Sequence, residues 1–195
     1  MFIEGGTGNG YAAKVNSDNM LYVRSVEQSI EHHVNRVKKR GFCVSFNQSP
    51  TAANDCFFWF QNTDTERDCI IEGVSLGFKN ASAVDGEVYF KLGDTGTANA
   101  ATDVTPVALN SESAYAANCT CQKGADLDNA GAGISGGTEC QRFIFAAIQD
   151  RSQTWHNFPM DIVLGPNGSI SMWATDAGAT YYVNMPIWYQ DRDLG

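Results

Sequence analysis

Histidines, cysteines and acidic residues are the side chains of this 195-residue sequence whose types could bind a metal ion. His32 and His33 are adjacent, so they point about 100° apart on a helix and to opposite faces on a strand. One metal ion cannot easily take both, and His156 lies far along the chain. The histidines therefore predict no metal site, and a solvated or interface role is the simpler interpretation.

The loop GADLDNAG, residues 124–131, carries oxygen ligands of the kind that Ca²⁺ takes. The candidate ligands are Asp126, Asp128 and Asn129. An acidic loop rich in glycine is more often simply solvated. Calcium binding therefore stays open as an alternative, and we predict no metal site.

Six cysteines are more than a cytosolic protein of this size usually carries. Three interpretations stay open. The thiols can be buried or half-buried and act as small apolar residues. A disulfide formed after the protein leaves the cell would join two of Cys119, Cys121 and Cys140. Zinc has little support, because the sequence has no C-x2-C and the C-x-C at 119–121 has no histidine nearby.

Local signatures of catalysis are missing from the chain. A nucleophilic triad needs Ser, Cys or Thr beside a histidine that a carboxylate orients, and no G-x-S-x-G turn occurs. The run GGTGNG, residues 5–10, follows no strand and lacks the Lys-Ser/Thr of a phosphate-binding loop. We therefore expect a protein that is not an enzyme and needs no cofactor.

Basic residues gather near the N-terminus of an otherwise acidic chain. Residues 1–40 carry a net charge of +2 and residues 41–195 a net charge of -11. The body would repel phosphate, so we expect it to bind no nucleic acid. The basic run can be a solvated face or an electrostatic contact with an acidic partner or sister subunit. The second interpretation assigns partner binding to Arg36, Lys38, Lys39 and Arg40.

The elements that must position these residues change character near residue 41. Residues 1–41 predict an N-terminal arm with a glycine-rich start, a short strand at 20–26 and a basic segment. In that segment Ile30, Val34 and Val37 have the spacing of one helix face that would end at Gly41. An extended arm is the alternative.

Residues 42–195 consist of short apolar runs separated by Gly, Asn, Asp, Ser and Thr. This pattern predicts an all-β domain: an antiparallel, jelly-roll-like β-sandwich of eight or nine strands. The expected strands span residues 42–47, 56–62, 69–78, 86–93, 104–110, 140–148, 160–165, 169–175 and 180–190.

Alternation within these runs predicts one dry and one wet face for each sheet. In the run 169–175, for example, Ile170 and Met172 fall on one face and Ser171 and Trp173 on the other. Two loops of small polar residues, 93–103 and 119–139, are expected to be surface excursions where partner contacts tend to lie.

Targeting and membrane signals are not recognisable. No apolar run approaches the roughly 20 residues of a membrane helix. The N-terminus has neither the basic start nor the apolar middle of a signal peptide. We therefore expect a soluble protein that is made in a cytosol and contacts no membrane.

The stretch GYAAKVNSDNMLYVRSV, residues 10–26, resembles the opening of many tailed-bacteriophage virion proteins. Those proteins have a glycine-rich start, then Ala-x-Val-Asn/Asp, then a short strand of the type Leu-x-Val-x-Ser/Ala-Val. The later order of strands and turns, at 57–78 and 86–97, is also similar to theirs. The matching positions of the opening are Ala13, Val15, Asn16, Leu21, Val23, Ser25 and Val26.

The resemblance implies a non-enzymatic virion structural protein. The first hypothesis is a capsid decoration or cement protein on the outer surface of the phage head. It would dock on the major capsid protein through its arm and form a homo-oligomer, often a trimer in such proteins. Trp155, Trp188 and Tyr189 are candidates for an oligomer or ligand surface.

The alternative is a fibre, neck or tail protein whose sandwich binds a receptor or glycan. Exposed aromatic rings can stack on sugar faces, although most aromatic residues of a sandwich belong to its core. The candidate rings are Trp155, Trp173, Tyr181, Tyr182, Trp188 and Tyr189.

Overall fold

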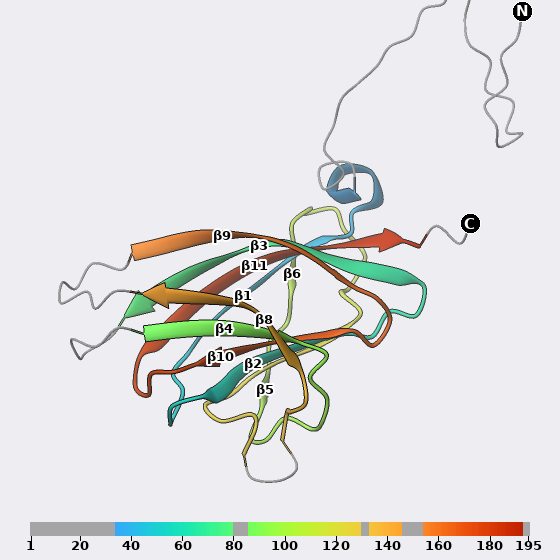
Figure 1. The fold of residues 1–195 in the computed structure, drawn as a ribbon. Helices are drawn as coiled ribbons and strands as arrows, with labels where there is room; N and C mark the ends of the chain where they lie inside the picture. Colours follow the sequence, from blue (N-terminus) through green and yellow to red (C-terminus); the bar gives the residue numbers. More distant parts are fainter. Residues whose placement is uncertain (1–33, 80–85, 130–132, 146–153, 193–195) are drawn as a thin grey trace, which may run out of the picture. The chain divides into compact units, whose positions relative to one another are not determined.

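Two antiparallel β-sheets lie face to face in this protein, as Figure 1 shows. The structure is a computed structural model, and it describes residues 34–79, 86–129, 133–145 and 154–192. Apart from a π-helical turn, η1 (Val34–Lys38), the regular structure of these residues consists of strands. The all-β antiparallel sandwich that the sequence predicts is therefore confirmed.

Each sheet combines long strands with one or more short ones. The five-stranded sheet has the order β6-β1-β11-β3-β9. Its strands are β1 (Gly41–Gln48), β3 (Arg67–Lys79), β6 (Val107–Ala108), β9 (Thr154–Leu164) and β11 (Thr180–Asp191). The six-stranded sheet has the order β5-β7-β2-β10-β4-β8. Its strands are β2 (Asp55–Asn62), β4 (Gly86–Leu92), β5 (Thr102–Asp103), β7 (Cys119–Lys123), β8 (Thr138–Phe145) and β10 (Ser169–Ala174).

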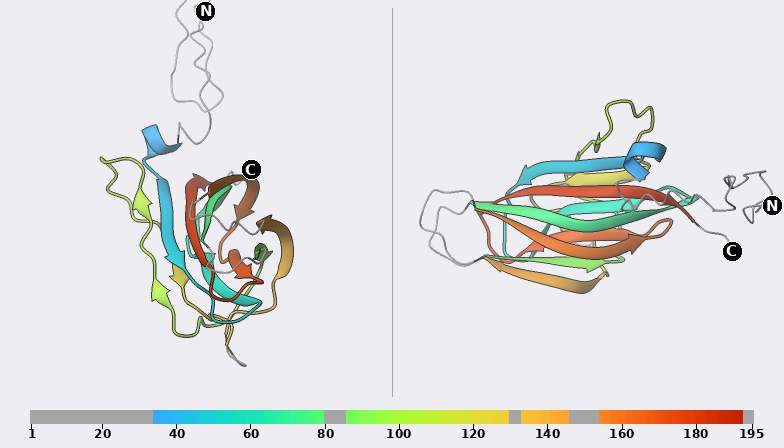
Figure 2. Two further views of the ribbon diagram at one scale, coloured as in Figure 1. Left: turned by 90° about the vertical axis from the view of Figure 1, so that its left-hand side faces the viewer. Right: turned by 90° about the horizontal axis from the view of Figure 1, so that it is seen from above.

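The long strands pair as if one long hairpin had been rolled up. Strand β4 pairs with β8, β3 with β9, β2 with β10, and β1 with β11, and all four pairs are antiparallel. Successive pairs fall in opposite sheets, and the two views of Figure 2 show the resulting layers. This connectivity is that of a jelly roll, as the sequence predicts.

Inward-facing side chains of both sheets form the main core. Strand β11 alternates between buried and half-buried residues along nearly its whole length, as expected when one face meets the core. Tyr181 stacks on Phe57 of the opposite sheet with 5.1 Å between ring centroids. Burying an aromatic or aliphatic side chain of this size stabilises the fold by about 1.5–3 kcal/mol. The inward residues of β11 are Tyr181, Val183, Met185, Ile187 and Tyr189.

The connection between β4 and β8 covers the outer face of the six-stranded sheet. All six residues of β10 are buried, so the wet face predicted for this strand is wrong. Leu127 and Ile134 of the connection are 0 % exposed, and they pack with outward residues of the sheet. The two predicted surface excursions therefore contribute to a second, smaller core. That core consists of Cys56, Trp59, Tyr89, Leu127, Ile134 and Trp173.

Four strands, β5, β6, β7 and β9, differ from the sequence prediction. The strand expected at 104–110 is wrong, because β5 and β6 lie on either side of Pro106 and join different sheets. Strand β7 falls in a stretch that the sequence presents as a loop. Strand β9 begins at Thr154, earlier than expected, and contains Pro159. A proline is tolerated there because β9 is an edge strand and pairs only with β3.

The N-terminal arm predicted for residues 1–41 lies mostly outside the described residues. The short strand at 20–26 and the start of the predicted helix at Ile30 cannot be compared with the structure. Within the described part, the turn η1 occupies the end of that predicted helix. Lys39 and Arg40 separate this turn from strand β1, which begins at Gly41.

Candidate functional site

The outer face of the five-stranded sheet is open to solvent where strands β9, β3, β11 and β1 lie side by side. One row across it places Gly77 between Trp155 and Tyr182, with Asn47 next to Tyr182. Trp155 is 44 % exposed, and its ring meets that of Tyr182 edge-on at 6.5 Å. A Cβ atom on Gly77 would lie 3.3 Å from Tyr182 Cβ and 3.4 Å from the indole. Glycine therefore lets both rings lie close to the sheet.

The neighbouring row of this face is polar. It runs Asn157, Ser75, Asn184, Ser45 across the same four strands. Ser75 Oγ donates to Asn157 Oδ1 and Ser45 Oγ donates to Asn184 Oδ1, both at 2.6 Å. Each asparagine thus uses the accepting end of its amide on a serine hydroxyl, and the donating end takes no part in that contact. Neither Nδ2 group has a partner among the described residues, and both are available to donate to a ligand.

A groove of about 530 Å³ extends from these rows across β1 to the β4–β8 connection. At its far end Lys123 Nζ donates to the backbone oxygen of Asn47 at 3.1 Å. Beside it, Asp103 Oδ1 accepts a hydrogen bond from Gln122 at 3.0 Å. We call this surface the Trp155 groove. Its lining residues are Ser45, Phe46, Asn47, Asp103, Val104, Lys123, Trp155, Tyr182, Val183 and Asn184.

The lining of the Trp155 groove offers groups suited to recognition. Its lining includes one carboxylate, Asp103, and neither histidine nor cysteine. General acid–base catalysis by a carboxylate pair or a histidine would need residues that this lining lacks. The groove instead offers aromatic rings for stacking and amide groups for hydrogen bonds.

The aromatic residues that the sequence predicts to form an oligomer or ligand surface do not all lie at the surface. Trp155 lines the groove, whereas Trp188 is half-buried on the same sheet face beside Ile70 and outside the groove. Tyr189 is 3 % exposed and donates to the backbone oxygen of Asn118 at 3.1 Å. The surface role predicted for Tyr189 is therefore wrong. Trp173 and Tyr181 are also buried, so Tyr182 is the ring that joins Trp155.

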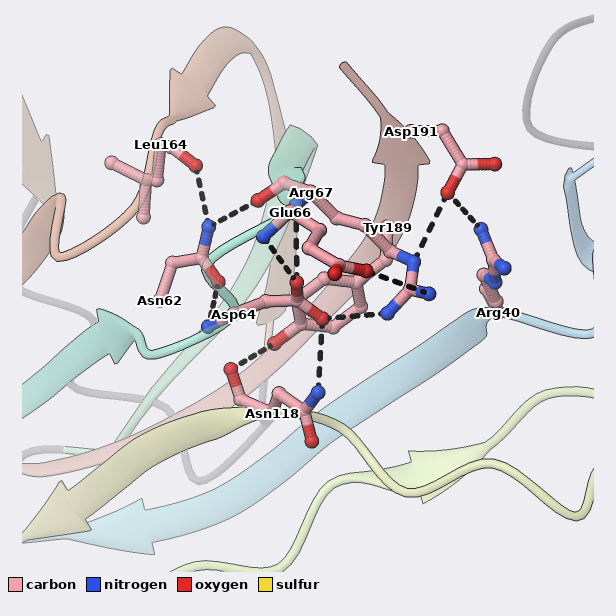
Figure 3. Close-up of polar contacts among 9 residues, drawn as sticks. All are labelled: Arg40, Asn62, Asp64, Glu66, Arg67, Asn118, Leu164, Tyr189 and Asp191. Carbon is pink, nitrogen blue, oxygen red and sulfur yellow. Dashed lines mark hydrogen bonds and ion pairs between the residues drawn. The ribbon is translucent and has the colours of Figure 1, made fainter.

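The four basic residues predicted to bind a partner have different surroundings. Arg36 and Lys38 are exposed and form no ion pair within the described part of the chain. Lys39 pairs with Glu112 at 3.0 Å. Arg40 pairs with Asp191 at 2.6 Å, as Figure 3 shows. Two of the four residues are thus held by acidic groups of their own chain, and partner binding by this segment stays a prediction.

Asp64 lies at the centre of the polar network in Figure 3. Its side chain is 5 % exposed and pairs with Arg67 at 2.9 Å. It also accepts hydrogen bonds from the backbone of Glu66 and Arg67 and from Asn118 Nδ2. Burial alone would raise the pKa of Asp64, but these donors outweigh it and hold the pKa below its ordinary value.

All six cysteines are free thiols. A disulfide from Cys140 to Cys119 or Cys121 is excluded, because three strands, β2, β10 and β4, lie between β7 and β8 in the six-stranded sheet. Four strand spacings amount to about 19 Å, whereas bridged Cα atoms lie within about 7 Å. Burial raises the pKa of the Cys119 thiol to about 11. These thiols therefore serve as half-buried or buried small side chains, with Cys140 the exposed exception.

Three carboxylates gather beside the start of β2. One oxygen from each of Asp55, Asp126 and Asp128 lies within 4.8 Å of the others. The third predicted ligand, Asn129, is exposed. Burial and the two neighbouring carboxylates raise the pKa of Asp126. Carboxylate oxygens are ligands that Ca²⁺ takes, so calcium remains an open hypothesis here.

His156 contacts the rings of Phe145 and Phe158, while His32 and His33 lie outside the described residues.

Comparison with known proteins gives no family for this chain. No protein-family model matches the chain, and no curated protein sequence matches it. The helical structure within the described ranges includes nothing long and apolar enough to cross a membrane.

Proposed function

We propose that this protein is a non-enzymatic binding protein whose Trp155 groove recognises a carbohydrate. The carrying observation is the exposed Trp155 ring, held beside Tyr182 over Gly77. Sugar rings present C–H faces that stack on aromatic rings and hydroxyl groups that accept and donate hydrogen bonds. The amides of Asn157 and Asn184 lie in the next row and supply donors for those hydroxyls.

The bacteriophage resemblance of the N-terminal sequence gives this proposal a biological setting. At a fibre, neck or tail, a sandwich that binds carbohydrate would recognise a glycan on the host surface. Oligomers would strengthen such binding, because several weak sites on one particle act together. The proposal therefore favours the fibre, neck or tail alternative for this chain.

Removal of the exposed rings tests the proposal. We expect the wild-type protein to bind at least one polysaccharide on an array of bacterial surface glycans. Trp155→Ala and Tyr182→Ala should each weaken that binding about 30-fold, because a central aromatic anchor contributes about 2 kcal/mol. Affinity is measured by calorimetry on the glycan that the array identifies.

Tyr115→Ala is the matched control, because Tyr115 is 52 % exposed and does not line the groove. Its affinity should equal that of the wild-type protein, and all three variants should keep the wild-type melting temperature within a few degrees. Binding by Trp155→Ala that equals wild-type binding would contradict the proposal. So would a wild-type protein that binds no glycan.

A second proposal, capsid decoration, is supported by Arg36 and Lys38. Both are exposed, and neither has an acidic partner within the described part of the chain. Such residues on a chain of net charge -9 would attract an acidic surface of a neighbouring protein. A cement protein would use them to dock on the major capsid protein, as part of a homo-oligomer.

Copy number in purified virions separates the two proposals. If the groove binds a host glycan from a fibre, neck or tail, the chain should be a small fraction of the major capsid protein in molar terms. A cement protein must instead cover the capsid lattice, which requires a near-stoichiometric ratio. Quantitative gel densitometry against the major capsid protein measures the ratio, and a near-stoichiometric value would favour decoration.

A further inference from the structure

The Trp155 groove runs across the strands of the sheet and not along them. Its lining begins at Trp155 on β9, continues over Tyr182 on β11 to Asn47 on β1, and ends at Lys123 and Asp103. Strands β9, β3, β11 and β1 are neighbours, as the right-hand view of Figure 2 shows. The distance from β9 to β1 is three strand spacings, or about 14 Å, which is longer than a single sugar ring.

The two ends of the groove differ in chemistry. Aromatic rings form one end, and the amide of Asn184 lies next to them. At the other end an ammonium group and a carboxylate face the groove. Lys123 uses one of its three N–H donors on Asn47, and Asp103 has one oxygen with no partner in the described part of the chain. This far end carries no net charge and can both donate to and accept from hydroxyl groups.

We propose that the groove takes a neutral oligosaccharide extended across the strands, in place of a single terminal sugar. This inference rests on the proposed carbohydrate binding. One sugar would stack on Trp155 and Tyr182, and a later sugar of the chain would hydrogen-bond with Asp103 and Lys123. An acidic polysaccharide fits less well, because residues 41–195 carry a net charge of -11 and the far end offers no excess cation.

Chain length is the variable that tests this inference. The probes are mono-, di-, tri- and tetrasaccharide fragments of the neutral polysaccharides on the array. We expect the affinity of the full-length protein to rise about tenfold or more from monosaccharide to trisaccharide, which corresponds to about 1.4 kcal/mol. Asp103→Ala should remove most of that gain. Trp155→Ala should weaken binding of every fragment.

Asp161→Ala is the matched control, because Asp161 is an exposed carboxylate on β9 that does not line the groove. It should retain the full dependence on chain length. Equal affinity for monosaccharide and trisaccharide would overturn the extended-chain inference and leave the proposed function standing. A gain that survives in Asp103→Ala, or tighter binding of uronic acid fragments than of neutral ones, would also overturn it. Absence of binding to every saccharide would remove the proposed function itself.

Discussion

Asp64→Ala is expected to lower the free energy of unfolding by about 3 kcal/mol, because it leaves Arg67 and several N–H donors without their buried acceptor. The Asp64 side chain is 5 % exposed and pairs with Arg67 at 2.9 Å. It also accepts from the backbone N–H groups of Glu66 and Arg67 and from Asn118. These contacts join the turn before β3 to the segment before β7. Urea unfolding followed by circular dichroism measures the loss.

Glu66→Ala is the control for this variant. The Glu66 side chain is 80 % exposed and lies 4.0 Å from the same guanidinium group. Exposed ion pairs contribute at most about 1 kcal/mol, so this change should be small. If both variants unfold at the same urea concentration as the wild-type protein, the network in Figure 3 does not stabilise the fold.

The same network predicts how stability depends on pH. Burial alone would raise the pKa of Asp64, but hydrogen bonds from the Glu66 backbone, Asn118 and Arg67 hold it below its ordinary value. Arg40, and then Arg67, lower the pKa of Asp191. A carboxyl group whose pKa is lower in the folded state contributes stability above its unfolded pKa, about 3.9 for Asp. That contribution is lost as the pH falls through the folded pKa. Asp64→Ala should therefore unfold with a weaker dependence on pH below about pH 4 than the wild-type protein.

The fold was predictable from the sequence wherever one face of a long strand meets the core. In β11, for example, the alternation of apolar and polar residues is visible without a structure. The prediction failed where tertiary contacts decide the outcome. Two-residue strands such as β5 and β6 bury too little to leave a pattern. The outer face of β10 is covered by a connection whose path across the sheet follows from no local pattern.

The candidate site was predictable only in part, because adjacent aromatic residues on a strand point to opposite faces. The sequence predicts that Trp155 and Tyr189 are surface residues. Trp155 lines the groove, whereas Tyr189 is buried. A signal was present in β11, where Tyr182 alternates in step with Asn184 and Gln190. These polar residues mark the outward face of the strand. Tyr189 precedes Gln190 directly, so its side chain points to the opposite face, toward the core. The contributions of Gly77 and Asp103 depend on sheet pairing, which the sequence alone does not reveal.

Asp94→Ala is expected to lower the free energy of unfolding by about 3–5 kcal/mol, because it leaves several buried donors without an acceptor. Asp94 is 0 % exposed on the outer side of the six-stranded sheet. Its carboxylate accepts from Gly137 N–H at 2.5 Å, from Trp173 Nε1 at 3.2 Å and from Ser171 Oγ. These bonds attach the β4–β8 connection to β10. The variant should shift the tryptophan emission and unfold at lower urea concentration.

Saccharide binding distinguishes this effect from a general loss of structure. Asp94 hydrogen-bonds residues of the second core, whereas Trp155 and Tyr182 lie on the outer face of the other sheet. Below the unfolding transition, Asp94→Ala should therefore keep the wild-type affinity for whichever glycan the groove binds. Asp161→Ala, which removes an exposed carboxylate, should match the wild-type protein in both stability and emission. Wild-type stability of Asp94→Ala would mean that the connection is held by its apolar contacts, such as those of Leu127 and Ile134, and not by the buried carboxylate.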